Sequence, residues 1–371
     1  MTRISIDCSP LLVRSAGVRT WLRGWLGALR ESGGVSVGTI LEPAGNGSDL
    51  NERQFAHPFQ LAVLQMLRRL PAGAGAMNAV TAGADVFHAS NFMRAAPARV
   101  RLSATLHDLT AWTVPECHRR AQIAADRMFA ERILRRADGL IAVSEHTRKD
   151  AVEILGIRPE KIAVIYPGVA EEYFSVTEGQ KEAAASAKQI TRPYFLFVGT
   201  IEPRKNLTTL LDAWMLLPVE VRRSTELIVA GMRGWECDRI LRRLSQMQKD
   251  DTGVRYLGYV EQRYLAGLTG GALALVYPSW YEGFGLPVAQ AMACGCPVVV
   301  SNVSALPEIA GGAGLLADPR SAGEIAGAML RIVESAAVRA GLAAAGIERA
   351  DLFRWPRAAA ESVRFFRDLA G

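Results

Sequence analysis

The sequence predicts an α/β protein built from two doubly wound, Rossmann-like domains. Apolar runs typical of buried strands alternate with amphipathic helical patterns along the chain, as in parallel sheets covered by helices on both faces. At 371 residues the chain is longer than one hydrophobic core usually serves. Residues 175–192 interrupt the alternation with small and polar residues, which indicates a linker or a surface excursion. We therefore expect one domain over residues 1–175 and a second over 190–354, facing each other across a central cleft.

The first domain is predicted from short apolar runs and from apolar residues that recur every three or four positions. Trp21, Leu22, Trp25 and Leu26 fall on one face of a helix that follows the first strand. Further helices are expected at 59–70, 123–136 and 147–155. Strands are expected at 3–8, 35–41, 85–89, 101–106, 139–144 and 161–166.

The second domain repeats the alternation after the predicted linker. Its first strand, 194–199, is a continuous apolar run typical of a strand buried on both faces. Further strands are expected at 227–230, 254–257, 272–277 and 298–301. Helices are expected at 207–216, 240–248, 264–269, 288–294 and 322–333.

Composition narrows the class of protein. Lys and Arg number 43 against 37 Asp and Glu, a net charge of +6, which suits a polyanionic ligand, an acidic membrane surface or no particular ligand. The five cysteines lack zinc-site spacing and are expected to be reduced thiols of a cytoplasmic protein. The N-terminus begins as a strand pattern without a signal-peptide core, and no apolar run has the length of about 18 residues that a membrane span needs.

Arg204 and Lys205 lie between a predicted strand end and a predicted helix start. A forked guanidinium beside a point-charge ammonium suits a diphosphate, and the N-terminus of a helix also favours anions. An isolated Arg-Lys pair is more commonly a solvated surface feature. The neighbouring Gly199 and Thr200, with the following helix, favour the anion-binding interpretation here.

A second candidate segment covers residues 277–300. Pro287 fits the first turn of a helix and Gly295 fits its end. Gly283 lacks a side chain that would block the approach of a ligand. Glu282 could bind hydroxyls or stabilise positive charge, or it could simply complement the helix dipole. The amides expected to point out of the helix N-terminus are those of Phe284, Gly285 and Leu286.

Together, Glu-Pro-Arg-Lys-Asn (202–206) and Tyr-Glu-Gly-Phe-Gly-Leu-Pro (281–287) resemble glycosyltransferase family 4, a family of retaining, metal-independent enzymes of the GT-B fold. The motifs Leu-His-Asp-Leu (106–109) and Met-Ala-Cys-Gly-Cys-Pro-Val-Val (292–299) agree in order and spacing. The resemblance is weak over 1–20, clear over 85–175 and strong over 194–320. Residues 42–84 match no pattern of the family.

The resemblance implies a role for each matching residue. Arg204 and Lys205 would neutralise the diphosphate of a nucleotide-sugar donor in place of a metal, so neither a metal nor a cofactor is expected. Glu282 would contact the donor sugar, and His107 would reach it from the first domain, although a lone histidine after a strand is more often structural. Donor-binding roles are implied for Gly17, Thr200, Tyr259, Val260, Gly283, Phe284, Gly285, Leu286 and Gln290.

Two features depart from the family pattern. Gln290 stands where the family has a glutamate that binds ribose hydroxyls. An amide can still accept a hydrogen bond but lacks charge-assisted strength, so we expect weaker ribose binding. The loop after the first strand, Ser15-Ala16-Gly17, contains one glycine and is thinner than usual.

The expected activity is transfer of a hexosyl or deoxyhexosyl group, mannosyl- or rhamnosyl-type, from a nucleotide diphosphate sugar to an acceptor hydroxyl in polysaccharide or glycoconjugate synthesis. The donor base (GDP, UDP or dTDP) and the acceptor (a glycan, a lipid-linked or a small molecule) stay open. A hydrolase or epimerase of the same fold and a non-catalytic nucleotide-sugar-binding member are the alternatives. No nucleic acid is expected as a partner.

Two parts of the chain carry further expectations. The amphipathic helix at 59–70, with Arg68 and Arg69 on its polar face, could line the acceptor cleft or make peripheral contact with anionic lipid, or simply pack on its own domain. The resemblance also implies that the C-terminal helix, within 355–371, crosses back onto the first domain.

Overall fold

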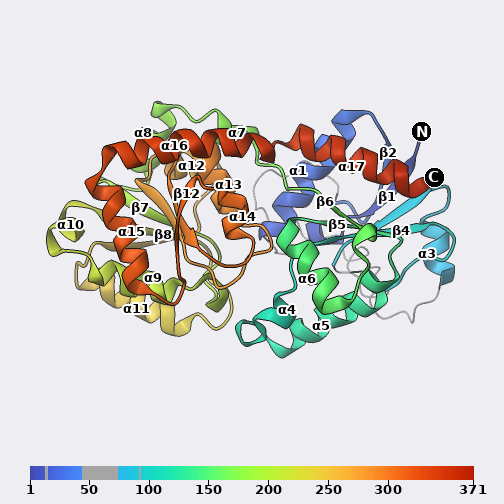
Figure 1. The fold of residues 1–371 in the computed structure, drawn as a ribbon, viewed down its shortest axis with the longest axis horizontal. Coiled ribbons are helices and arrows are strands. Elements are labelled where there is room, and N and C mark those ends of the chain that lie inside the picture. The colour runs from blue at the N-terminus through green and yellow to red at the C-terminus, as the bar shows by residue number, and fades with distance from the viewer. Residues whose placement is uncertain (13–15, 44–73, 92) are drawn as a thin grey trace. The chain divides into compact units, whose positions relative to one another are not determined.

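The computed structural model contains two compact units (Figure 1). The first comprises residues 1–168 and 353–371, and the second comprises 169–352. The structure describes residues 1–12, 16–43, 74–91 and 93–371. The amphipathic segment 59–70, with its predicted acceptor or lipid contact, therefore lies outside the described residues, as does Ser15 of the glycine loop.

The first unit contains a six-stranded parallel sheet in the order β2-β1-β3-β4-β5-β6. Each strand lies within its predicted range, so the strand predictions for this unit are confirmed. The strands are β1 (Arg3–Asp7), β2 (Ser36–Ile40), β3 (Val86–Ala89), β4 (Arg101–Leu106), β5 (Gly139–Ala142) and β6 (Ile162–Val164).

The helices of the first unit begin and end where local chemistry favours it. The Ser144 hydroxyl accepts a hydrogen bond from the Thr147 amide at the start of α6, and Gly156 ends this helix with a φ of 66°. The helix predicted at 123–136 ends earlier, because a 3-10 turn follows it over Leu134–Arg136. The helices are α1 (Ala16–Ser32), α3 (Ala74–Val80), α4 (Thr110–Thr113), α5 (Arg120–Arg132), α6 (Glu145–Leu155) and α17 (Trp355–Ala370).

The C-terminal helix α17 packs on α1 (Figure 1). The Trp25 indole donates a 2.9 Å hydrogen bond to the Ser362 hydroxyl. Trp355 approaches Gly24 and Gly168 so closely that a Cβ on either glycine would lie 2.3 or 2.1 Å from its ring. Two glycines and one indole therefore hold the end of the chain in the first unit.

The second unit contains a six-stranded parallel sheet in the order β12-β11-β10-β7-β8-β9. The sequence did not reveal its edge strand β12, which is short, begins with glycine and exposes half of Leu316. The strands are β7 (Tyr194–Val198), β8 (Glu226–Ala230), β9 (Val254–Gly258), β10 (Ala274–Tyr277), β11 (Val298–Ser301) and β12 (Gly314–Ala317).

The stretch expected to be a linker or a surface excursion contains a helix of the second unit, α8. Thr177 and Gln180 form a reciprocal capping box at its start. α8 packs on α12, where a Cβ on Gly267 would lie 2.3 Å from the Gln180 carbonyl. Small residues suit such close packing, but in the sequence they resemble a linker. The second unit therefore begins at 169, before the predicted start at 190. The helices are α7 (Glu171–Phe174), α8 (Glu178–Ala187), α9 (Leu207–Leu216), α10 (Val219–Ser224), α11 (Asp238–Lys249), α12 (Gln262–Gly270), α13 (Leu286–Ala293), α14 (Leu306–Ala310), α15 (Ala322–Glu334) and α16 (Ala336–Ala350).

Each sheet contains one point at which the strand order reverses. In the first unit this point lies between β1 and β3, and in the second it lies between β7 and β10. Loops that leave neighbouring strands in opposite directions open a crevice at the carboxyl edge, where open α/β sheets bind ligands. The two edges are where functional side chains are expected.

Candidate active site

The loops that follow β7 and β10 meet at the reversal point of the second unit. The chain leaves β7, forms a 3-10 turn over Pro203–Lys205 and enters α9 through Asn206, which has a φ of 54°. The Asn206 side-chain amide donates to the Pro278 carbonyl at 2.9 Å and to the Pro319 carbonyl at 2.7 Å. This asparagine therefore fixes the loop that carries Arg204 and Lys205 against the loop after β10.

Arg204 and Lys205 are both ion-paired to Glu282. Arg204 Nη1 lies 2.9 Å from Glu282 Oε2, and Lys205 Nζ lies 2.6 Å from Glu282 Oε1. Arg204 Nη2 makes a second pair, at 2.8 Å, with Glu202. Lys205 also donates a 2.6 Å hydrogen bond to the Tyr277 hydroxyl. The structure thus joins the three predicted residues in one network and adds two that the sequence analysis assigned no role.

This network holds its charges in a poorly solvated place, since its charged side chains are 4–13% exposed. Burial alone would raise the pKa of Glu282, but the cationic Arg204 and Lys205 outweigh it and lower that pKa to about 2. Burial and the neighbouring Arg204 lower the pKa of Lys205, against the opposing effect of Glu282. Two carboxylates therefore balance two cations at this edge.

The predicted helix after Glu282 is confirmed as α13. Pro287 lies in its first turn, Gly285 is its N-cap with a φ of 91°, and Gly295 follows its end with a φ of 67°. A Cβ on Gly285 would lie 2.6 Å from Leu306 Cδ2. The Glu282 amide donates to the Ser304 hydroxyl at 3.0 Å. The amides of Phe284, Gly285 and Leu286 consequently lie at the start of a real helix at the carboxyl edge.

The other predicted donor-binding residues of this unit also follow strand ends. Thr200 lies in the loop after β7, packed on the loop after β8, since a Cβ on Gly234 would lie 2.7 Å from Thr200 Cγ2. Val260 is buried just after β9, beside the half-buried Tyr259. Gly283 is buried in the loop before α13, and Gln290 is half-buried on that helix.

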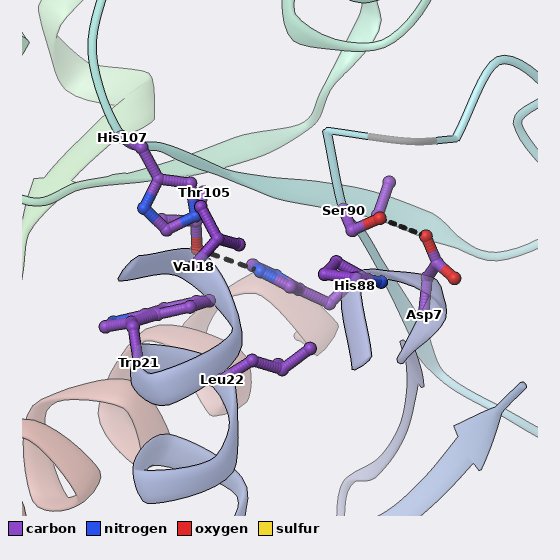
Figure 2. A pocket seen from close by; sticks show the side chains of 10 residues that line it. Asp7, Val18, Trp21, Leu22, His88, Ser90, Thr105 and His107 are labelled. Atoms are coloured by element: carbon purple, nitrogen blue, oxygen red, sulfur yellow. Dashed lines mark hydrogen bonds between the residues drawn. The ribbon is translucent and has the colours of Figure 1, made fainter. Parts of the chain in front are cut away.

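A pocket lies at the reversal point of the first unit (Figure 2). His107 follows β4, and its ring meets the Trp21 indole of α1 edge-on at 4.6 Å. Gly17, in the first turn of α1, is exposed and has open space where a Cβ would lie. The pocket is lined by Asp7, Pro10, Val18, Trp21, Leu22, His88, Ala89, Ser90, Thr105 and His107.

Two titratable groups of this pocket, His88 and Asp7, are held by hydroxyls. His88 bonds to Ser103 at 2.9 Å and to Thr105 at 3.0 Å, and Asp7 accepts from Ser9 and Ser90. Burial lowers the pKa of His88 to about 3, and burial lowers that of His107 to about 4. Burial also raises the pKa of Asp7. The imidazoles are therefore uncharged near neutral pH and suited to neutral hydroxyls.

Sequence reasoning missed several of these residues, although signals existed. Asp7 and His88 are polar residues inside short apolar strands, and each ends or nearly ends its strand at the carboxyl edge. Glu202 is the first residue of the motif 202–206, and Tyr277 ends the strand before the motif 281–287. A search for polar residues at predicted strand ends would have found Asp7, His88 and Tyr277.

Among the described residues, no group of three or more His, Cys, Asp or Glu side chains is arranged to hold a metal ion. No helix in that part of the chain has the length and apolarity to cross a membrane.

Comparison with known proteins places this geometry in a family. Residues 16–173 match the family model of glycosyltransferase family 4, and residues 192–335 match that of the glycosyl transferases group 1. Over 284 residues the chain is 34% identical to the O-antigen chain mannosyltransferase B of Escherichia coli, covering 76% of this chain and 74% of that protein. The chain belongs to glycosyltransferase family 4. It is a glycosyltransferase, as the two motifs predicted.

The structural likeness extends along the whole family 4 chain. Sucrose-phosphate synthase from Thermosynechococcus elongatus superposes with a TM-score of 0.76 at 22% identity, covering 100% of this chain and 99% of that one. Anabaena HepE in complex with UDP-glucose superposes with a TM-score of 0.72 at 19% identity, covering 98% and 100%. The likeness confirms the predicted GT-B fold class.

Proposed function

We propose that this glycosyltransferase moves a mannosyl group from a nucleotide diphosphate sugar to a glycan hydroxyl, with retention at the anomeric carbon, in polysaccharide assembly. The observation that carries the proposal is the buried Arg204–Lys205–Glu282 network at the carboxyl edge of the second sheet. The 34% identical relative named as an O-antigen mannosyltransferase supports the sugar. UDP-glucose bound to HepE supports the class of donor.

The network is suited to stabilising a leaving diphosphate. Lys205 uses two of its N–H donors on Glu282 and Tyr277, and an ammonium carries a further N–H that can meet a phosphate oxygen. Arg204 adds a second positive charge, fixed by two carboxylates and by its bond to the Tyr281 carbonyl at 2.7 Å. Cations fixed before the reaction stabilise developing charge without reorganisation.

The chemistry follows from this charge stabilisation. The bond between the anomeric carbon and the β-phosphate oxygen breaks, and its electron pair stays on the phosphate beside Arg204 and Lys205. The acceptor oxygen bonds to the same face of that carbon, and its proton passes to the departing phosphate oxygen. Glu282, ionised at neutral pH, stabilises the positive charge that develops on the sugar.

Product analysis tests the proposal. The purified protein is incubated with GDP-mannose, UDP-glucose or dTDP-rhamnose and a mannose-terminated glycan, and the product linkage is determined by NMR. We expect a mannosylated glycan with the anomeric configuration of the donor. Free sugar released without an acceptor would instead identify a hydrolase, and tight donor binding without any product would identify a non-catalytic member.

Two further parts of the proposal have separate tests. We propose that no metal or cofactor is required, so that EDTA leaves the turnover unchanged.

We also propose that Gln290 weakens ribose binding, so that Gln290→Glu tightens nucleoside diphosphate binding without changing turnover at saturating donor. The five cysteines form no disulfide among the described residues, which suits the reducing cytoplasm that we propose as the site of action.

A further inference from the structure

We propose that Trp21 is a positioning residue for His107, and that the C-terminal helix α17 fixes Trp21 through Trp25. Every residue on this path belongs to the first unit. The use of His107 in sugar transfer rests on the proposed function, whereas the position of its ring does not. Separate measurements therefore test the two.

The His107 ring is oriented by an aromatic contact. Among the described residues it makes no hydrogen bond, whereas His88 is held by Ser103 at 2.9 Å and Thr105 at 3.0 Å. The Trp21 indole meets the His107 ring at 4.6 Å between centroids, with the ring planes 84° apart (Figure 2). Aromatic rings favour this edge-to-face arrangement. It orients the imidazole while both ring nitrogens stay available to a ligand.

Trp21 is half-buried and is itself supported by a second indole. Trp25 lies one turn further along α1, on the same face of the helix. The two indoles stack with centroids 5.0 Å apart and planes 18° apart. Trp25 is 2% exposed, and close packing restricts the rotamers of a buried side chain. The buried indole therefore holds the half-buried one in place.

Helix α17 encloses Trp25 from the far end of the chain. The Trp25 indole donates a 2.9 Å hydrogen bond to the Ser362 hydroxyl, which donates in turn to the Ala358 carbonyl at 2.7 Å. One turn later the Phe366 ring lies 5.9 Å from Trp25 between centroids. Ser362 and Phe366 are both fully buried. A continuous path of contacts therefore joins α17 to the pocket at the carboxyl edge of the first sheet.

The alternative is that these aromatic rings only fill the core of the first unit. Trp25 and Phe366 belong to that core, and Trp21 packs against its edge. Trp21 also lines the pocket that contains His107. Loss of a core-filling ring lowers stability and leaves His107 unchanged. Loss of a positioning ring also changes the surroundings and the orientation of the imidazole.

The first test follows the pKa of His107 by NMR, with its imidazole protons assigned by means of His107→Gln. Burial lowers this pKa to about 4, while Asp108 raises it. Asp7 and His88 line the same pocket. The test variants leave these titratable side chains unchanged, so a change in the pKa reports on the surroundings of the ring.

Trp25 is the position that separates the two roles, because its indole reaches His107 through Trp21. Trp25→Phe removes the indole N–H, so in the proposed role it should loosen Trp21 and raise the pKa of His107 by about one pH unit. In the core-filling role it lowers the Tm alone. Trp214→Phe is the matched control, since this indole donates to the Thr252 carbonyl at 2.8 Å in the second unit. It should lower the Tm and leave the pKa of His107 unchanged.

The second test is kinetic, with GDP-mannose and a mannose-terminated glycan. Trp21→Leu should lower kcat by about tenfold or more with little change in the KM for the donor, because a misplaced group loses contacts made in the transition state. Trp21→Phe keeps an aromatic face and should restore most of kcat. In a His107→Gln background Trp21→Leu should cause no further loss, since its effect passes through the imidazole.

An unchanged pKa of His107 in Trp25→Phe overturns the proposal, as does an equal change in Trp214→Phe. An equal loss of kcat from Trp21→Leu with and without His107 also overturns it, because Trp21 would then act on the fold alone. Native turnover in His107→Gln refutes the use of His107 in transfer, and absence of transfer in the native chain refutes the proposed function. In both cases the pKa measurement still decides whether Trp21 positions the ring.

Discussion

Lys205 Nζ lies 2.6 Å from Glu282 Oε1, although the two residues are 77 positions apart. They meet because β7 and β10 are neighbours in the sheet while the chain between them builds β8 and β9 on the other side. The reversal of strand order thus produces the ion pair. It also makes the pair the natural place to test the proposed function.

Removing the two cations should abolish most of the activity. For Arg204→Ala combined with Lys205→Ala we expect turnover to fall by about 10²–10³-fold or more, because the leaving phosphate loses fixed positive charge. Arg243→Ala, which breaks the more exposed pair with Asp212 in the same unit, serves as the control and should leave turnover unchanged. Equal activity of the double variant and the control would refute the phosphate-stabilising role.

Neutralising Glu282 should have opposite effects on stability and on diphosphate binding. Glu282→Gln leaves two buried cations with one carboxylate, so the free energy of unfolding should fall by about 3 kcal/mol. The site gains net positive charge, so a nucleoside diphosphate should bind more tightly while turnover drops. Denaturant titration and calorimetry measure both quantities. Weaker diphosphate binding would show that Glu282 holds the cations in place rather than competing for them.

Tyr277 should matter for catalysis beyond its contribution to stability. Tyr277→Phe removes the hydroxyl that accepts from Lys205 at 2.6 Å, costing about 1 kcal/mol of stability and freeing the ammonium to move. Tyr194→Phe is a matched control, since its buried hydroxyl donates to the Leu268 carbonyl at 2.7 Å. Both variants should lose similar stability, but only Tyr277→Phe should lower turnover. Equal turnover in the two would restrict Tyr277 to a structural role.

Acid should destabilise the first unit through its buried histidines. His88 and His107 have pKa values of about 3 and about 4 in the fold, below 6.5 in the unfolded chain, so only the unfolded chain gains their protons between about pH 6 and pH 4. Each then lowers the free energy of unfolding by up to about 1.4 kcal/mol per pH unit. Asp126, whose pKa burial raises to about 6, acts in the opposite direction.

Comparison with a variant isolates the histidine effect. His88→Gln should unfold with a shallower dependence of stability on pH than the native chain between pH 6 and pH 4, measured by denaturant titration at each pH. Glu282 does not interfere at the upper end of this window, because its contribution is lost only as the pH falls below about 4.5 toward its folded pKa of about 2. Identical slopes would mean that His88 is protonated in the folded protein.

Gly285 should tolerate no side chain. Gly285→Ala places a Cβ 2.6 Å from Leu306 on a backbone with a φ of 91°, so we expect a loss of about 1–3 kcal/mol and a displaced α13 N-terminus. Gly327→Ala, in α15 with open space around it, should instead stabilise by about 0.5–1 kcal/mol. Thermal unfolding of both variants measures the contrast. A harmless Gly285→Ala would show that the loop relaxes.

Much of this architecture was predictable because it depends on local patterns. Strand and helix periods identify every strand of the first sheet and all but β12 of the second. Pro287 and Gly295 mark both ends of α13 because their backbone preferences act on their own residues. The prediction of a linker or surface excursion over 175–192 missed α8, since alanines that pack α8 closely on α12 have no sequence signature that separates them from a flexible spacer.

By itself the sequence determined the two α/β units, the family, and three members of the ion network. A motif is recognised from its residue types and their spacing, and neither depends on how the chain folds. Only the tertiary structure decided that Glu202 and Tyr277 complete that network, and that Asp7 and His88 share a pocket with His107. The physical reason is the distance along the chain over which each effect acts. Propensity and periodicity act over a few residues, whereas ion pairs and burial depend on which strands become neighbours. Strand order brings together residues as distant in sequence as Lys205 and Glu282.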